Sequence, residues 1–347
     1  MNTGNLDKFD FKKSWENTLR NLPQGLIKLE PPIGDCLKPE NTVADLAMTM
    51  DDGKATRNVP IVMPDYPENK DQAHIGEFQG IITLVDLLRF LPPYDGFPTE
   101  YLEKNFNLNQ IYQAIRSFNQ DNGSEKISDI FEEELQGLPT TLNEDSPLKD
   151  LFEKHIQITK GKRKCRTLPV IKPAKGNSHC ILGMWEYTHA LELIKEKGGQ
   201  IISGKNVSDV CYKGPFNTLD EDSTLAQVRE QLTAPPYYTH IPIKTTDGSA
   251  VIGFVDEISF YTFQHSIFDR YWRGMPIKEI VKKVKKQDVV ELNTPISELI
   301  DRFVKKRTKP TAILVGKIED GKFNLQGTVN YVDILEKFID WVEKSQD

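Results

Sequence analysis

Four short segments of this 347-residue chain place a glycine and a polar residue between an apolar strand pattern and a helical pattern. In the first segment Gly80 closes an apolar run, Thr83 follows three residues later, and Asp86 stands three residues further on. A strand-to-helix corner can hold phosphate, because the helix N-terminus offers unpaired N–H groups and a positive dipole end. Residues three apart share a helix face, so Thr83 and Asp86 are expected to point the same way. The pattern indicates a nucleotide site without settling its use.

The corner recurs three more times along the chain, which indicates an internal repeat. Its other copies begin at Gly183, Gly253 and Gly327. Each copy follows an earlier apolar strand, which carries a proline in the first three units and none in the fourth. Each unit therefore reads helix, strand, strand, helix. Because one unit alone has little core, we expect the units to pair.

The first helix of each unit has a polar start and one apolar stripe. Apolar residues return three apart, as at Leu148 and Leu151 or Ile296 and Leu299, which predicts one buried face per helix. The polar residues suited to the N-cap are Asn41, Ser146, Ser223 and Thr294.

The composition is that of a globular protein, with 38% hydrophobic and 27% charged residues. No stretch approaches the length of a membrane span, and residues 1–13 lack a signal-peptide core. The four cysteines are scattered, which argues against a metal site or a disulfide framework. A net charge of −7 makes nucleic acid an unlikely partner. We expect a cytoplasmic protein with no metal and no membrane contact.

The four units resemble cystathionine β-synthase (CBS) domains, whose hallmark is a Gly-apolar-apolar-Thr/Ser-x-x-Asp/Asn corner after an apolar-Pro-apolar strand. The resemblance implies an α+β fold of four CBS repeats, paired into two pseudo-twofold modules like those of the gamma subunit of AMP-activated protein kinase. The modules either form a disc within one chain or pair as a homodimer. The expected boundaries are 1–31 for an N-terminal extension, 32–92 for the first repeat, 93–125 for a helical insert, and 126–198, 206–265 and 276–346 for the second, third and fourth repeats.

In this family the corner hydroxyl contacts a phosphate, and the aspartate accepts hydrogen bonds from both ribose hydroxyls. The resemblance therefore implies ligand contacts at Thr83 and Asp86. In the fourth copy Asn330 and Asp333 keep an amide donor and the carboxylate. The adenine would lie near Asn58 and Val59 of the first unit. The alternative is a capping box, in which the two corner side chains bind amides of their own helix.

Residues just before the first strand of each hairpin supply the second group of candidates. The basic ones would neutralise the phosphates of a ligand seated on the paired unit. An ordinary solvated loop is the competing interpretation. The candidates are Arg57, Arg166, Lys309 and the neighbouring Thr311.

The second and third corners are altered. They carry Glu186 with His189, and Asp256 with Ser259. A carboxylate at the phosphate position repels the ligand, so we expect no nucleotide at either corner.

The repeats account for nearly the whole chain, and no catalytic motif is present. We therefore expect a regulatory protein, not an enzyme, that binds AMP, ADP or ATP between repeats and signals to an unidentified partner protein. It needs no cofactor, and Mg²⁺ would enter only with ATP. The alternatives are a ligand-independent interaction scaffold or a sensor of an S-adenosylmethionine-type ligand. Nucleotide hydrolysis by Glu186 or Asp256 ranks last.

Overall fold

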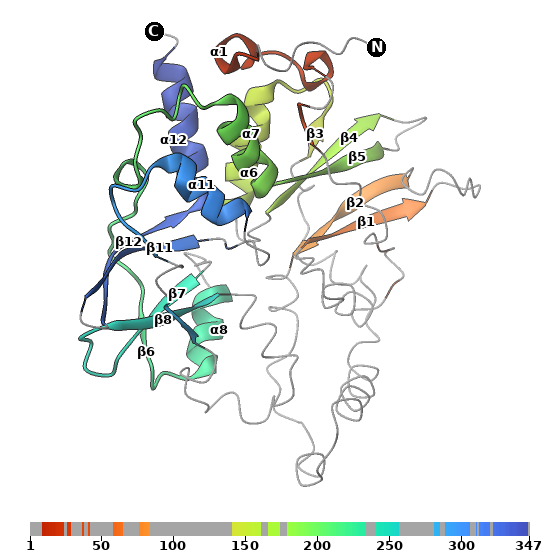
Figure 1. Cartoon of the computed structure of the whole chain (residues 1–347). Helices are drawn as coiled ribbons and strands as arrows, with labels where there is room; N and C mark the ends of the chain where they lie inside the picture. Colours follow the sequence, from red (N-terminus) through yellow and green to blue (C-terminus); the bar gives the residue numbers. More distant parts are fainter. Residues whose placement is uncertain are drawn as a thin grey trace.

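The computed structural model describes the greater part of the chain, and the elements alternate as the repeat predicts (Figure 1). The described residues are 9–23, 26–28, 37, 41, 58–64, 76–83, 141–160, 166–173, 179–233, 240–256, 281–284, 289–305, 310, 312–319 and 322–345. The predicted insert 93–125 lies outside them.

Each repeat contributes one antiparallel hairpin. The four hairpins are β1 (Asn58–Pro64) with β2 (Gly76–Thr83), β4 (Thr167–Pro173) with β5 (His179–Glu186), β7 (His240–Lys244) with β8 (Val251–Asp256), and β11 (Ala312–Glu319) with β12 (Lys322–Asn330). A two-residue strand lies parallel to the first strand of the last three hairpins, namely β3 (Leu142–Asn143), β6 (Leu219–Asp220) and β10 (Val289–Val290). Another short strand, β9 (Lys282–Lys283), pairs with β8.

All four hairpins have a register shift at the same place. The repeat glycines 80, 183, 253 and 327 pair with Ile61, Val170, Ile243 and Val315, and the next pair skips one residue of the second strand. The extra residue stands immediately before the glycine in every copy. A β-bulge bends its strand and increases the local twist, so the same device directs each strand toward its corner. This shared register supports the alignment of the four copies.

The described helices bury the stripe that the sequence predicts. They are α6 (Leu148–Lys160), α7 (Tyr187–Lys197), α8 (Leu225–Thr233), α11 (Ile296–Val304) and α12 (Tyr331–Lys344). Leu148, Leu151, Val228, Ile296 and Leu299 are all fully buried.

The predicted caps Ser146, Ser223 and Thr294 are wrong by one residue, since their helices begin two positions later. Each hydroxyl instead accepts a hydrogen bond from the backbone amide three residues before it, at 3.3, 3.1 and 3.1 Å. The N-cap of α11 is Pro295, whose carbonyl accepts from two amides of the first turn. The predicted residues therefore close the turn between a short strand and its helix.

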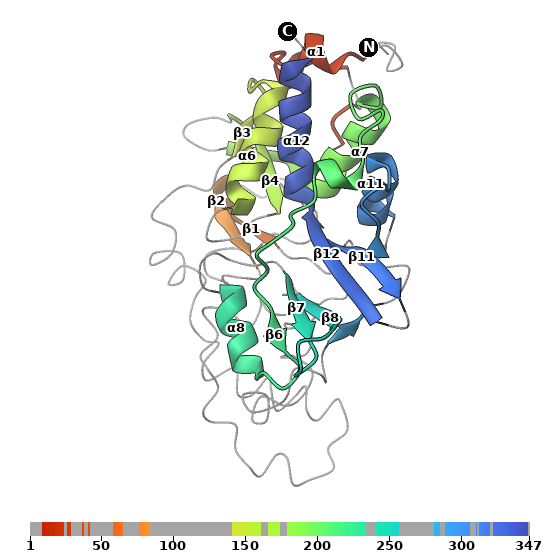
Figure 2. The ribbon, with the colours of Figure 1, turned by 90° about the vertical axis from the view of Figure 1, so that its left-hand side faces the viewer.

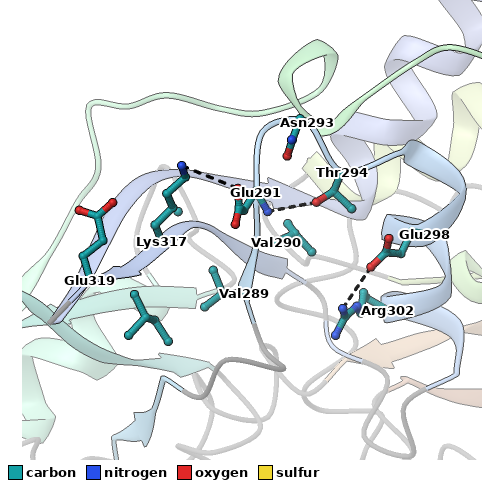
Figure 3. Close-up of a pocket in the computed structure, with 11 residues that line it drawn as sticks. Val289, Val290, Glu291, Asn293, Thr294, Glu298, Arg302, Lys317 and Glu319 are labelled. Carbon is teal, nitrogen blue, oxygen red and sulfur yellow. Dashed lines mark hydrogen bonds and ion pairs between the residues drawn. The ribbon is translucent and has the colours of Figure 1, made fainter. Parts of the chain in front are cut away.

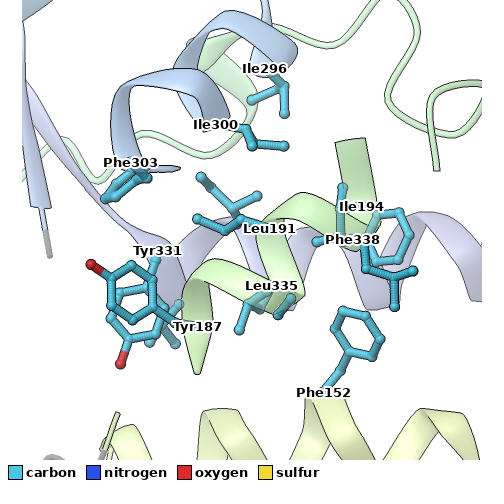
Figure 4. Close-up of a cluster of buried hydrophobic side chains, with 14 of the residues drawn as sticks. Phe152, Tyr187, Leu191, Ile194, Ile296, Ile300, Phe303, Tyr331, Leu335 and Phe338 are labelled. Carbon is cyan, nitrogen blue, oxygen red and sulfur yellow. The ribbon is translucent and has the colours of Figure 1, made fainter. Parts of the chain in front are cut away.

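The second and fourth repeats share one hydrophobic core. Figures 1 and 2 show α6, α7, α11 and α12 gathered together, with α7 packed on α11 and α12, and α6 packed on α12. Phe152 and Phe338 pack together in this cluster, with ring centroids 5.7 Å apart, and Leu191 belongs to the same cluster (Figure 4). Strand contacts join the other repeats, because β2 packs on β5 through Ile81, and β12 pairs with β8.

The N-terminal extension closes one end of this core. Its helix α1 (Phe11–Ser14) is followed by Trp15 and by the 3₁₀ turn η2 (Leu19–Asn21). Phe11 and Trp15 are buried against Phe152 and Phe338, with ring centroids 5.0–6.4 Å apart. The extension is therefore part of the fold.

Candidate functional site

The first corner brings three predicted residues into one register. Asn58 pairs with Thr83 at the end of β2, and Val59 pairs with Ile82. Val59 is completely buried. Arg57 and Asp86 lie outside the described residues, as do Lys309 and Thr311 of the fourth repeat.

The fourth corner is described in full. Strand β12 ends at Asn330, opposite Ala312, and α12 begins at the next residue. The Asn330 side chain accepts a hydrogen bond from the backbone N–H of Val332 at 3.1 Å. Asp333 accepts one from the backbone N–H of Asn330 through Oδ2, at 2.7 Å. The Asn330 side chain also accepts from the backbone N–H of Asp333, and this contact forms, with the bond from the Asn330 amide to Asp333, the capping box that the sequence left open as the alternative.

The cap leaves acceptor capacity on the Asp333 carboxylate. An ionised carboxylate has two oxygens and about four lone-pair positions. Among the described residues, only Oδ2 has a hydrogen-bond donor. The other oxygen, Oδ1, is not used by the cap.

The environment of Asp333 disfavours its charge. Burial raises the pKa of Asp333 to about 6, the hydrogen bond from Asn330 lowers it, Glu336 raises it and Lys160 lowers it. The side chain is half-buried. A carboxylate with such a raised pKa is a candidate functional group, because a structural cap needs no buried charge.

A segment of the third repeat lies across the fourth corner. Tyr212 and Thr328 exchange two backbone hydrogen bonds, at 2.9 and 3.0 Å. A Cβ on Gly327 would lie 2.1 Å from the Cys211 sulfur and 2.8 Å from the Tyr212 carbonyl, so only glycine fits there. Burial raises the pKa of the Cys211 thiol, while Lys213 lowers it and Asp333 raises it. Cys211 and Lys213 therefore belong to the surroundings of this corner, which the sequence did not indicate.

The second corner is closed by its own side chains. Glu186 stands at the N-cap of α7 and its carboxylate accepts from the third amide of the helix, that of His189. The Glu186 amide in turn donates to Nδ1 of His189 at 3.2 Å, and the Thr188 hydroxyl donates to the carboxylate at 3.2 Å. The Glu186 carboxylate places a negative charge where a phosphate would lie, which is the reason for expecting no nucleotide here.

Arg166 lies next to this second corner. It precedes Thr167, which pairs with Glu186, and its side chain is only 2% exposed. A guanidinium buried so deeply is costly without an anion or acceptors, so it is not a residue of a solvated loop. At the third corner His240 pairs with Asp256, which is also buried.

A separate hollow of about 940 Å³ lies on the outer side of the fourth repeat, beside β10 and the start of α11 (Figure 3). Four of its charged lining residues form ion pairs, with Lys317 3.9 Å from Glu291 and Arg302 3.2 Å from Glu298. None of the predicted nucleotide-binding residues lines it. We assign it no ligand.

Contacts between the second and fourth repeats are another part of the site region that the sequence did not indicate. Tyr187 and Tyr331, the first residues of α7 and α12, stack with ring centroids 4.2 Å apart (Figure 4). The Tyr187 hydroxyl donates to the Pro310 carbonyl at 3.1 Å, and the Tyr331 hydroxyl lies 2.9 Å from that of Thr159. A tyrosine directly after the corner residue in both units was the available signal.

Two kinds of feature are absent from the described residues. They contain no cluster of histidine, cysteine and carboxylate side chains able to hold a metal ion. No helix among them has the length and apolar character to cross a bilayer.

Four bulged hairpins, two of which lead directly into a described helix, fit the CBS fold that the sequence predicts, and the predicted α+β architecture is confirmed by a solved structure. A Methanocaldococcus jannaschii protein, described as a proposed archaeal homologue of the AMPK γ subunit, matches with a TM-score of 0.61 and 15% identity. The match covers 87% of this chain and 95% of that one. At this identity the likeness establishes the fold alone.

Two further structures are less similar to this chain. An uncharacterised conserved protein of Pyrococcus horikoshii has a TM-score of 0.49 at 14% identity, covering 90% of this chain and 97% of its own. A hemolysin-like CBS-domain protein of Oenococcus oeni has a TM-score of 0.32 at 16% identity, and the match covers 40% of this chain and 94% of that one. No protein-family model matches the sequence, and no curated protein sequence is significantly similar to it.

Proposed function

We propose that this chain is a regulatory protein that binds an adenine nucleotide at its first and fourth corners. The observation that carries the proposal is the Asp333 carboxylate, half-buried, with a raised pKa and one oxygen unused by the cap. Two ribose hydroxyls would supply the hydrogen bonds that offset the burial of this charge.

The phosphate would lie at the N-terminus of α12, where Asn330 is the N-cap. Thr83 and Asp86 would act in the same way at the first corner, with Asn58 and Val59 beside the adenine. Arg57, Lys309, Thr311 and Arg166 are proposed as neighbours of the phosphates. Binding would shift the relation between the repeats, and a partner protein would read that shift. Catalysis is not part of the proposal.

Calorimetric titration with adenosine, AMP, ADP, ATP and S-adenosylmethionine tests this function. The parent chain should bind AMP at two sites, and Asp86→Ala and Asp333→Ala should each remove one. Asp247→Ala is the control, because Asp247 also accepts a backbone hydrogen bond, 2.9 Å from the Ser249 amide, in the turn between β7 and β8 at the hairpin end opposite the corner. Undiminished binding in the double variant of Asp86 and Asp333 would refute the assignment.

A ligand-independent scaffold is the second candidate, favoured by the self-capped second corner. In that case none of the five compounds would produce heat. Partner capture would also be equally efficient with and without nucleotide. A nucleotide-dependent interaction would exclude it.

A further inference from the structure

The fourth corner is faced by a cation from the second repeat. Lys160, the last residue of α6, forms an ion pair with Glu336 of α12. Glu336 stands three residues after Asp333, on the same helix face. Lys160 is also the cation whose charge lowers the pKa of Asp333. The Lys160 side chain of the second repeat therefore interacts electrostatically with two carboxylates beside the proposed site, Glu336 and Asp333.

A buried hydrogen bond fixes the end of α6 at this place. The Thr159 hydroxyl donates to the carbonyl of His155 at 2.8 Å, and it lies 2.9 Å from the Tyr331 hydroxyl. A threonine hydroxyl has one hydrogen, so Tyr331 is the donor to Thr159. Both side chains are buried. Lys160 is thus held at the first turns of α12.

The ion pair itself is exposed and weak. The side chains of Lys160 and Glu336 are 56% and 41% exposed. Exposed pairs of this kind contribute little to stability, because solvent and salt screen them. A phosphate carries more negative charge than a carboxylate and more acceptor oxygens. It can therefore displace Glu336 from the lysine.

We propose that Lys160 and Glu336 form a displaceable latch that makes the fourth corner selective for ligands carrying a phosphate. Without ligand, Glu336 holds Lys160 in place. When a nucleotide binds, its phosphate takes Lys160, and the second and fourth repeats become joined through the ligand. Glu336 opposes binding by competing for the cation and by repelling the phosphate. The proposal rests on nucleotide binding at the fourth corner and adds the source of its phosphate selectivity.

Calorimetric titration with AMP and with adenosine tests the latch. The Asp86→Ala background is used so that only binding at the fourth corner is measured. Lys160→Gln should weaken AMP about tenfold, as expected for a lost charge-assisted hydrogen bond, and leave adenosine within about twofold. Glu336→Gln should tighten AMP by about two- to fivefold and leave adenosine unchanged. Lys337→Gln and Asp340→Asn are matched controls, because this exposed pair on α12 has the same charges at 3.4 Å. Both controls should bind AMP like the background chain.

The outcomes separate the two proposals. AMP binding that is lost in Asp333→Ala but unaffected by Lys160→Gln and Glu336→Gln would overturn the latch and leave the nucleotide site standing. Equal losses of AMP and adenosine in Lys160→Gln would also overturn it. If the Asp86→Ala chain binds neither AMP nor adenosine, both the fourth-corner site and the latch are refuted.

Discussion

At the scale of single residues, one carboxylate combines a structural and a proposed ligand-binding role. Asp333 caps its helix through one oxygen, yet burial raises its pKa to about 6. An asparagine would provide an acceptor without a buried charge. The Asp333 carboxylate therefore fits the ribose-binding role that we propose.

The raised pKa predicts the pH dependence of adenosine binding at the fourth corner. Below pH 6 the free Asp333 carboxyl is protonated and must release a proton to accept two ribose hydroxyls. In the Asp86→Ala background, affinity should be constant above about pH 7 and fall toward about tenfold per pH unit well below 6. Adenosine is the right probe, because the AMP phosphate titrates in the same range. A flat profile would speak against ribose binding by Asp333.

His155 predicts a separate effect of pH on stability. It is fully buried in α6, and neither ring nitrogen has a hydrogen-bond partner among the described residues. Burial, with a smaller effect of His189, lowers the pKa of His155 to about 3. Since the unfolded chain takes up this proton near pH 6.5, the free energy of unfolding should decrease as pH falls from 6.5 toward 3.

Chemical denaturation of the parent and of His155→Leu across this range measures the effect. The variant should lose less stability on acidification than the parent. Identical losses would mean that His155 does not stay neutral in the fold. Asp333 has the opposite effect on stability: because its pKa is raised in the folded state, its protonation increases the free energy of unfolding as pH falls from about 6 to about 4. The difference between parent and variant is therefore the informative quantity.

At the scale of elements, the repeated bulge and the repeated glycine work together. The register shift stands directly before the glycine in all four hairpins. At Gly327 the reason for glycine is the segment of the third repeat that crosses it. At the fourth corner the repeat glycine thus permits a contact between repeats as well as a local turn.

Gly327→Ala should destabilise the fold by about 1–3 kcal/mol, the usual cost of overpacking. The added Cβ would lie 2.1 Å from the Cys211 sulfur. Combining it with Cys211→Ala should recover part of the lost stability, because the sulfur is then absent. Recovery should be incomplete, because the Tyr212 carbonyl remains 2.8 Å from the added Cβ. Gly199→Ala is the control, because its nearest neighbour is 3.8 Å away. Thermal unfolding compares the four proteins, and equal melting temperatures would contradict the close crossing.

At the scale of the whole molecule, the second and fourth repeats are joined by a shared core, a tyrosine stack and polar contacts. Lys195 pairs with Asp301, and Lys160 with Glu336, across this boundary. The N-terminal extension covers one end of the same core. The fourth corner is therefore coupled to the second repeat by packing.

Trp15→Ala should lower stability by about 3–5 kcal/mol, as for other buried aromatic residues. Trp15 is 1% exposed and packs on Phe152, 5.4 Å between ring centroids, and on Phe338. Lys13→Ala, at an exposed position two residues earlier, should have little effect. Denaturant unfolding gives both values, and a small loss for Trp15→Ala would mean that the extension is not part of the folded core.

The sequence predicted those features that depend on local pattern. Alternating apolar residues and the glycine corners gave the hairpins and the order of the elements, and Leu148 and Leu151 gave the buried helix face. Helix starts at Ser146 and Thr294 were misplaced by one residue, because a hydroxyl can close a turn as well as cap a helix. Contacts between distant segments, such as Tyr331 with Thr159, depend on how repeats pack, and the sequence pattern does not contain that information.

A crystal structure of the chain with AMP is the most direct test of the central claim. We expect the ribose hydroxyls within hydrogen-bond distance of Asp333, the phosphate at the start of α12, and Lys160 turned from Glu336 to the phosphate. An empty fourth corner at saturating AMP, with Asp333 bonded only to the Asn330 amide, would contradict the account.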